Sequence, residues 1–340
     1  MNAALLVRAL RDPDTVAKLG PAQWNALIAM ARAERLIGTL ALRIGALRIG
    51  ALRPGDMPVP QAVRLILADA RLDAAREARQ ALWEADRAAV ALASSGLRVV
   101  LLKGTAYAAA GLAAGEGRFI GDLDILVHRE ALGDVERHLM AAGWEWVKDD
   151  PYDDAYYRQW MHELPPMIHR ERDRMIDVHH TILPLTARQT PDAAAMIAEA
   201  LPVGNGLFVL SPEDRVCHAV AHMLADGDLA GGLRNLWDIY WLLREADPAA
   251  LERRAARHGL ARHVGQARRL ADAIYGERRL SVTLWDRIVI ARLLARDGWG
   301  RESRKCLRFA FYVRSHWLRM PPLMLARHLF TKWRKGYRPA

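Results

Sequence analysis

The segment spanning residues 99–127 limits the fold more than any other part of the sequence. It opens with an apolar run, residues 99–102, whose length and paired valines indicate a short buried strand. Lys103-Gly104-Thr105 ends that run, and the alanine-rich stretch that follows predicts a short helix. A glycine-rich turn then leads to Asp122. We therefore expect a strand, a helix and a second strand in close succession.

The second strand of this segment, residues 122–127, carries two acids among apolar residues. If it is extended, Asp122 and Asp124 lie on one face, about 7 Å apart along the chain, because side chains alternate with period 2. Leu123 and Ile125 then face a core. Neighbouring carboxylates repel each other unless a cation or a proton lies between them. The pair therefore predicts a metal site.

Composition excludes several classes of protein. The 340 residues are 52% hydrophobic and 26% charged, which is typical of a folded globular protein and excludes general disorder. The two cysteines, Cys217 and Cys306, give neither a disulfide framework nor a zinc–cysteine pattern. No signal-peptide pattern and no run of about 18 apolar residues is present. We expect a cytoplasmic protein of two or three domains.

The net charge of +10 is concentrated at the C-terminus. Residues 301–340 contain eleven Lys or Arg and a single acid, Glu302. The other 300 residues are balanced, with 38 basic against 38 acidic side chains. The basicity is therefore a local feature and not a property of the globular body.

The pattern along the chain predicts an α+β protein with four parts. These are a helical N-terminal region (1–95), a core with a mixed sheet (96–205), a helical domain (206–300) and a basic amphipathic tail (301–340). The first part includes a long helix over 60–94 and a tandem repeat over 41–55, ALRIG-ALRIG-ALRPG, which we interpret as a small duplication. In the core we expect a helix over 130–142, a strand over 144–147 and a loop over 148–160.

Two further strands, 166–169 and 175–179, are predicted to form a hairpin. On the second of them, Asp177 shares a face with His179. Ser211-Pro212 then predicts a helix start, with a hydroxyl cap and proline in the first turn.

Three short motifs in this order carry a resemblance. They are Leu102-Lys103-Gly104-Thr105, then Arg118 ahead of Asp122-Leu123-Asp124, then Ile176-Asp177-Val178-His179. Together they resemble the nucleotidyltransferase superfamily of DNA polymerase β. More narrowly, they are similar to its uncharacterised bacterial branch whose first motif reads LKG. A later stretch that includes Asp214, His222 and Asp238 also matches that branch, so the resemblance covers roughly residues 98–245.

The resemblance implies a polymerase-β-like core, a nucleoside triphosphate substrate and two divalent cations, Mg²⁺ or Mn²⁺. In this superfamily an acceptor hydroxyl or phosphate attacks the α-phosphorus and pyrophosphate leaves. Asp122 and Asp124 would bridge the metals, and Asp177 would bind one of them and help to deprotonate the acceptor. The implied nucleotide-binding residues are Lys103, Gly104, Thr105 and Arg118. The acceptor is not identified.

Two alternative functions stay open. One is a non-catalytic nucleotide-binding or scaffold protein that has kept the fold, although the intact Asp122, Asp124 and Asp177 argue against it. The other is a toxin-like nucleotidyltransferase that modifies tRNA, which the basic tail permits.

The tail and one pair of histidines have their own interpretations. His218 and His222 have the i, i+4 spacing of metal ligands, but no third ligand is evident, so we interpret them as core histidines. The tail interleaves aromatic and basic side chains. It is either a helix packed on the body, a peripheral contact with an anionic membrane, or a nucleic-acid contact.

Overall fold

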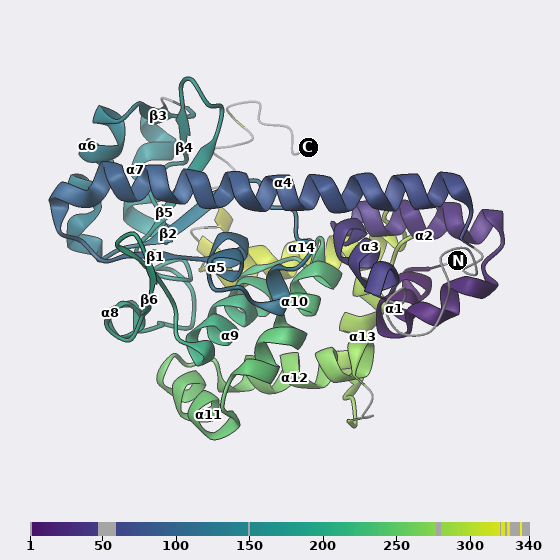
Figure 1. Cartoon of the computed structure of the whole chain (residues 1–340). Coiled ribbons are helices and arrows are strands. Elements are labelled where there is room, and N and C mark those ends of the chain that lie inside the picture. The colour runs from purple at the N-terminus through teal and green to yellow at the C-terminus, as the bar shows by residue number, and fades with distance from the viewer. Residues whose placement is uncertain are drawn as a thin grey trace.

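A computed structural model describes residues 2–46, 59–148, 150–276, 280–319, 321–323, 325–326 and 334. One long helix, α4 (Gln61–Leu92), spans most of the molecule (Figure 1). Helix α3 packs against one part of it, and the β-sheet and its flanking helices pack against another. The combination of many helices with one mixed sheet confirms the expected α+β class.

The other helices of the described chain follow in order. They are α1 (Ala4–Arg11), α2 (Pro21–Ala33), α3 (Ile37–Ala46), α5 (Lys103–Ala109), α6 (Leu132–Ala141), α7 (Pro151–Trp160), α8 (Ala193–Ala198), α9 (Pro212–Val220), α10 (Gly232–Glu245), α11 (Pro248–Arg257), α12 (Ala261–Tyr275), α13 (Leu284–Leu293) and α14 (Lys305–Arg319). The first copy of the tandem repeat continues α3, and most of the rest of the repeat lies outside the described residues.

The sheet has seven strands in the order β3-β4-β5-β2-β1-β7-β6. They are β1 (Val99–Leu101), β2 (Leu123–Leu126), β3 (Trp144–Trp146), β4 (Met167–His169), β5 (Met175–His179), β6 (Leu201–Gly204) and β7 (Leu207–Val209). Strand β2 lies between β5, to which it is parallel, and β1, to which it is antiparallel. The central strands β1 and β2 are fully buried, and for β1 its apolar run predicted this.

Helix α4 packs through small side chains. Its buried stripe is rich in alanine and includes Ala70, Ala74, Ala81, Ala85 and Ala88. Alanine allows the close approach of neighbouring backbones. The larger apolar residues Leu82 and Val90 of the same helix are 37% and 61% exposed.

Helix α7 replaces the loop predicted over 148–160. Asp150 caps it, since its carboxylate accepts hydrogen bonds from the backbone N–H groups of Tyr152 at 2.9 Å and Asp153 at 3.4 Å. Pro151 occupies the first turn, where its missing N–H costs nothing. None of the helix's side chains is fully buried, so the sequence shows no apolar period there.

The sheet extends past residue 205, because β7 pairs with β1 and β6 pairs with β7.

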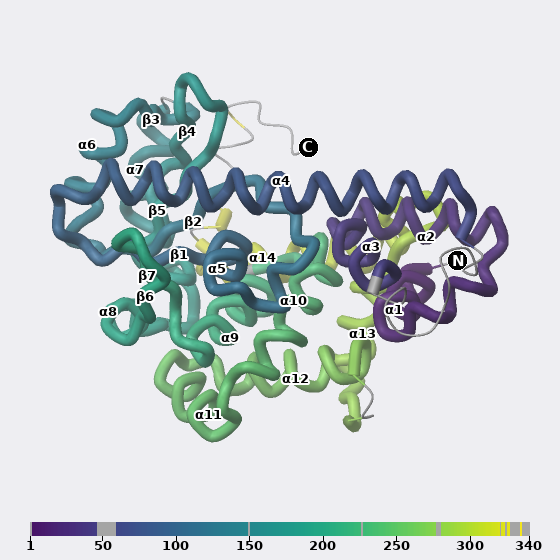
Figure 2. The backbone as a smooth tube through the Cα atoms, viewed as in Figure 1, coloured from purple at the N-terminus to yellow at the C-terminus, as the bar shows by residue number. Residues whose placement is uncertain are grey.

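Helices from the two ends of the chain also pack together. Helix α1 contacts α12, and the Ala3 N–H donates to the Leu294 carbonyl just after α13. The trace in Figure 2 shows α1 close to α13. The boundaries at residues 95, 205 and 300 stay predictions about folding units.

Helix α14, the first part of the basic tail, is docked on the body. Phe311 is 2% exposed and stacks on Trp285 with ring centroids 5.6 Å apart. Arg314 donates to the Leu224 carbonyl at 2.9 Å. The residues after Arg319 lie largely outside the described chain.

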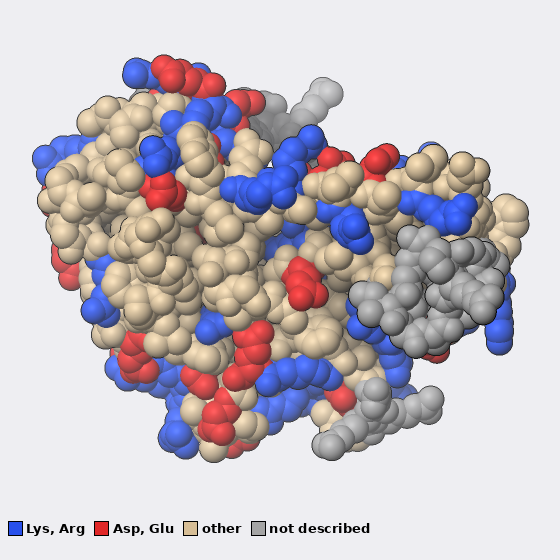
Figure 3. Space-filling model, in the orientation of Figure 1, with Lys and Arg blue, Asp and Glu red and all other residues tan. Residues whose placement is uncertain are grey.

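Charged side chains of both signs are interspersed on the face in Figure 3, in agreement with the balanced charge of residues 1–300. Among the described residues, no helix combines the length and apolar character that crossing a bilayer requires.

Candidate active site

Three carboxylates meet on two neighbouring parallel strands. Asp122 directly precedes β2, Asp124 is its second residue, and Asp177 lies opposite Asp124 on β5. One oxygen of each carboxylate lies within 4.8 Å of an oxygen of the other two. The convergence predicted from the period of the strands is therefore present, although Asp122 itself lies just outside the strand.

Helices α3 and α4 hold the turn that leads to Asp122. The Ile120 N–H donates to Glu77 on α4 at 3.0 Å, and the Thr39 hydroxyl on α3 donates to the Glu116 carbonyl at 3.0 Å. Gly117 has a φ of 65°, and a Cβ there would lie 2.5 Å from the backbone of Gly38. Only glycine fits this crossing, so the glycine-rich turn is shaped by its packing on α3.

Lys103 neutralises the most buried of the three carboxylates. Its Nζ lies 2.5 Å from Asp124 Oδ1, and Asp124 is 2% exposed. Burial lowers the pKa of Lys103, but the charge and hydrogen bond of Asp124, together with the charges of Asp122 and Glu163, raise that pKa above its usual range. For Asp124, burial raises the pKa, but Lys103 and His179 together hold it well below its usual value. Both groups are therefore charged at neutral pH.

The surroundings of Asp177 raise its pKa, whereas those of Asp124 lower it. Its Oδ1 is buried and accepts no hydrogen bond within the described chain. Burial, and then the negative charges of Glu163 and Asp124, raise the pKa of Asp177 to about 7. Asp177 is thus a carboxylate that can take up or release a proton near neutral pH.

Arg118 lies against Gly104 and reaches across to α10. The Arg118 guanidinium is ion-paired with Asp238 on α10, which also accepts a hydrogen bond from Arg234 Nε at 2.9 Å. A Cβ at Gly104 would lie 2.6 Å from Arg118 Nε. Glycine at this position therefore accommodates Arg118, and Asp238 pairs with Arg234 within α10.

Thr105 lies inside α5 and is 1% exposed, and its hydroxyl has no hydrogen-bond partner in the described part of the chain. The four predicted nucleotide-binding residues therefore have different surroundings in this structure. Lys103 reaches the carboxylates, whereas Arg118 and Gly104 contact each other, and Thr105 is buried.

The sequence did not predict that His162 and Glu163 contact His179. His179 lies between two carboxylates, with Nε2 3.0 Å from Asp124 Oδ1 and Nδ1 3.4 Å from Glu163 Oε2. The His162 ring stacks on that of His179 with centroids 5.2 Å apart. The shared strand face of Asp177 and His179 was predicted, but no sequence pattern placed residues 162–163 against His179.

His218 and His222 do not form a metal site with a third residue in the described chain. His218 is 5% exposed, which agrees with its interpretation as a core histidine. His222 is exposed and lies on a π-helical turn, Ala221–Asp226. The exposure of His222 shows that its interpretation as a core histidine is wrong.

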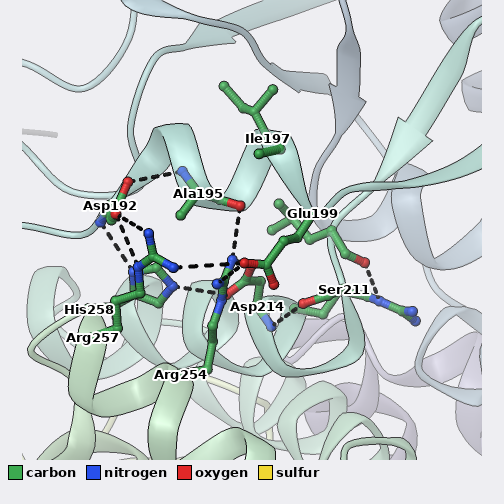
Figure 4. Close-up of polar contacts among 12 residues, drawn as sticks. Asp192, Ala195, Ile197, Glu199, Ser211, Asp214, Arg254, Arg257 and His258 are labelled. Carbon is green, nitrogen blue, oxygen red and sulfur yellow. Dashed lines mark hydrogen bonds and ion pairs between the residues drawn. The ribbon is translucent and has the colours of Figure 1, made fainter.

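Asp214 belongs to a structural ion network and not to the site. Its carboxylate accepts two hydrogen bonds from Arg254 on α11, both at 2.6 Å, and lies 2.9 Å from His258 Nε2 (Figure 4). Ser211 caps α9 by accepting from the Asp214 N–H, as the Ser-Pro start predicted. This network ties α9 to α11.

Comparison with known protein families shows to which family the chain belongs. The sequence model of a family described as uncharacterised nucleotidyltransferase matches residues 20–276, more than half of the chain. The chain belongs to this nucleotidyltransferase family. A search of the curated proteins found no match. The narrower LKG branch stays a prediction.

The donor set of this site suits a hard divalent cation. Three carboxylates converge, and one buried oxygen of Asp177 has no hydrogen-bond partner within the described residues. Such oxygen ligands are the ones that Mg²⁺ and Mn²⁺ prefer. The residues present therefore fit the cations that the family implies.

Proposed function

We propose that the protein transfers a nucleoside monophosphate from a nucleoside triphosphate to an acceptor, with release of pyrophosphate. The observation that carries this proposal is the convergence of Asp122, Asp124 and Asp177 within 4.8 Å in a chain of the nucleotidyltransferase family. In the proposal these three residues hold Mg²⁺ or Mn²⁺. When bound, such cations stabilise negative charge on the attacking and leaving oxygens.

Asp177 is the proposed general base. Without a metal ion its pKa is raised to about 7, and a bound cation would lower that pKa and favour the carboxylate form that a base needs. In this role Asp177 would accept the proton of the acceptor hydroxyl as the new bond to the α-phosphorus forms. The buried oxygen that lacks a hydrogen-bond partner in the described chain is consistent with such a part.

Lys103 is the proposed phosphate ligand among the four nucleotide-binding candidates. Its ammonium is charged and reaches the carboxylates. Arg118 supports the site indirectly, because its pairing with Asp238 fixes α5 against α10. We propose that Gly104 and Thr105 contribute through the backbone and the packing of α5.

We also propose that α14 contacts anionic membranes. Phe309, Tyr312, Val313 and Trp317 follow one another at helical spacing and are 66%, 40%, 48% and 47% exposed. An exposed apolar stripe beside basic residues is typical of helices that lie in a membrane interface. The acceptor could then be presented at a membrane surface.

The test of the transferase activity is incubation of the protein with each α-labelled nucleoside triphosphate and Mg²⁺. RNA, lipid and polysaccharide fractions from cells are added separately. The proposal predicts that label enters one fraction and that Asp122→Asn abolishes this incorporation. Specific binding of a triphosphate without any transfer would instead support a nucleotide-binding scaffold.

A further inference from the structure

A second group of metal-ligating side chains lies beside the three aspartates. His162 and Glu163 follow α7, and their backbone runs antiparallel to the end of β5. The Leu164 N–H donates to the Val178 carbonyl at 2.9 Å, and the His180 N–H to the His162 carbonyl at 2.9 Å. These backbone contacts bring His162 and Glu163 against His179.

The distances between the three side chains suit ligands of a single ion. Glu163 Oε2 lies 3.4 Å from His179 Nδ1 and 3.7 Å from His162 Nε2, and all three atoms lie within 4.8 Å of one another. Ligands at about 2.1 Å from a tetrahedral zinc ion are about 3.4 Å apart. A bound ion would therefore require only a small contraction of the cluster.

His179 supplies the second observation. Its side chain is 3% exposed, and its Nδ1 is buried without a hydrogen bond in the described chain while it faces Glu163. Its other nitrogen, Nε2, lies 3.0 Å from Asp124 Oδ1. A metal-bound histidine commonly donates its second ring N–H to a carboxylate, which fixes the tautomer and the ring orientation. Asp124 is placed to accept that hydrogen bond.

We propose that His162, Glu163 and His179 bind a divalent transition-metal ion of the zinc class. Two imidazoles and one carboxylate favour such an ion over Mg²⁺, which prefers oxygen ligands. The ion holds residues 162–164 against β5 and orients His179 toward Asp124. This site uses none of Asp122, Asp124 or Asp177 as a ligand, so it goes beyond the proposed transferase function.

The test uses the full-length protein, treated with a chelator and then dialysed against Zn²⁺ in excess Mg²⁺. Bound zinc is measured by elemental analysis. We expect a single zinc ion per chain that Mg²⁺ does not displace. His162→Gln and Glu163→Gln should each weaken zinc binding by about 100-fold or more. His138→Gln, which changes a histidine on α6 outside the cluster, should bind zinc like the wild type.

Asp122→Asn separates this proposal from the transferase function, because it should lose nucleotidyl transfer and keep the zinc. Substitution of Co²⁺ adds a spectroscopic readout, since its visible absorption bands report histidine ligation and should disappear in Glu163→Gln. Thermal unfolding of each metal-free variant shows whether it folds, and Glu163→Gln carries the test if His162→Gln does not. Absence of bound zinc, or zinc that both cluster variants retain, would overturn the proposal.

Discussion

Lys103 Nζ lies 2.5 Å from Asp124 Oδ1, and Lys103 itself has a left-handed backbone with a φ of 48°. Residues other than glycine rarely adopt this conformation, and the strain it carries is often found at functional sites. The ammonium therefore occupies one side of a carboxylate that we propose as a metal ligand. A cation that binds Asp124 has to share it with Lys103.

This competition predicts the behaviour of Lys103→Met. Without the ammonium, Asp124 carries its full negative charge, so Mg²⁺ should bind the nucleotide-free protein more tightly, by roughly tenfold. Nucleotidyl transfer should fall, because the proposed phosphate ligand is lost. Calorimetric titration with Mg²⁺ checks the first effect, and Lys148→Met, an exposed lysine, is the matched control. Weaker Mg²⁺ binding in Lys103→Met would contradict the competition.

The neighbouring aspartates should differ in their effect on stability. Asp122 is exposed, so Asp122→Asn should leave the thermal midpoint unchanged or raise it by relieving repulsion. Asp124→Asn leaves the partly buried Lys103 without its charged partner and should cost about 3 kcal/mol. Both variants should lose transfer activity. Denaturant unfolding in the absence of metal measures the difference, with the exposed Asp134→Asn as control. Equal stability of the two site variants would show that the Lys103–Asp124 pair contributes little.

The raised pKa of Asp177 predicts that the free energy of unfolding depends on pH. Its pKa is raised from 3.8 to about 7 in the folded protein. The folded state therefore binds this proton more tightly than the unfolded state does. The associated stability is complete below about pH 4 and is lost as the pH rises to 7, up to about 4 kcal/mol. Asp177→Asn removes this loss, so its gain in midpoint over the wild type should be larger at pH 8 than at pH 5, without metal. A gain that is the same at both values would rule out the raised pKa.

The features that could be predicted from the sequence are those that depend on residues close to one another in the chain. Alternation along residues 122–127 and 175–179 was sufficient to bring Asp122, Asp124 and Asp177 to one side of the sheet. The Ser211 cap of α9 also depends on neighbouring residues only. Helix α7 had the same kind of start signal at Asp150-Pro151, but its lack of buried side chains concealed it.

Pairings between distant parts of the chain could not be predicted. Arg118 meets Asp238 across 120 residues, and nothing in either local pattern indicates that ion pair. Arg118 was therefore assigned to phosphate binding when its guanidinium is already paired. Glu163 reaches His179 because the chain after α7 returns along β5, and that return depends on a helix the sequence did not predict.

The proposed membrane contact of α14 has a test that leaves the fold intact. Near an anionic bilayer each basic residue contributes about 1 kcal/mol of attraction. The full-length protein should therefore sediment with anionic vesicles at low salt and be released at high salt. Phe309→Gln combined with Val313→Gln removes exposed side chains, so it should reduce sedimentation without lowering the thermal midpoint.

The buried Phe311 is the contrasting position on the same helix. Phe311→Ala should lower the midpoint, because large-to-small changes in a core cost about 3–5 kcal/mol. If the full-length protein ignores vesicles but binds RNA with a steep dependence on salt, the tail is a nucleic-acid contact. If it binds neither, the tail is part of the helical body.

The most direct test of the central claim compares nucleoside triphosphates labelled at the α- and at the γ-phosphate, with Mg²⁺ and the acceptor fraction that takes up label. Nucleotidyl transfer moves the α-phosphate to the acceptor and releases the γ-phosphate within pyrophosphate. We predict incorporation of the α-label alone by the wild type, and of neither label by Asp122→Asn. Incorporation of the γ-label, or equal α-label incorporation by Asp122→Asn, would contradict the account.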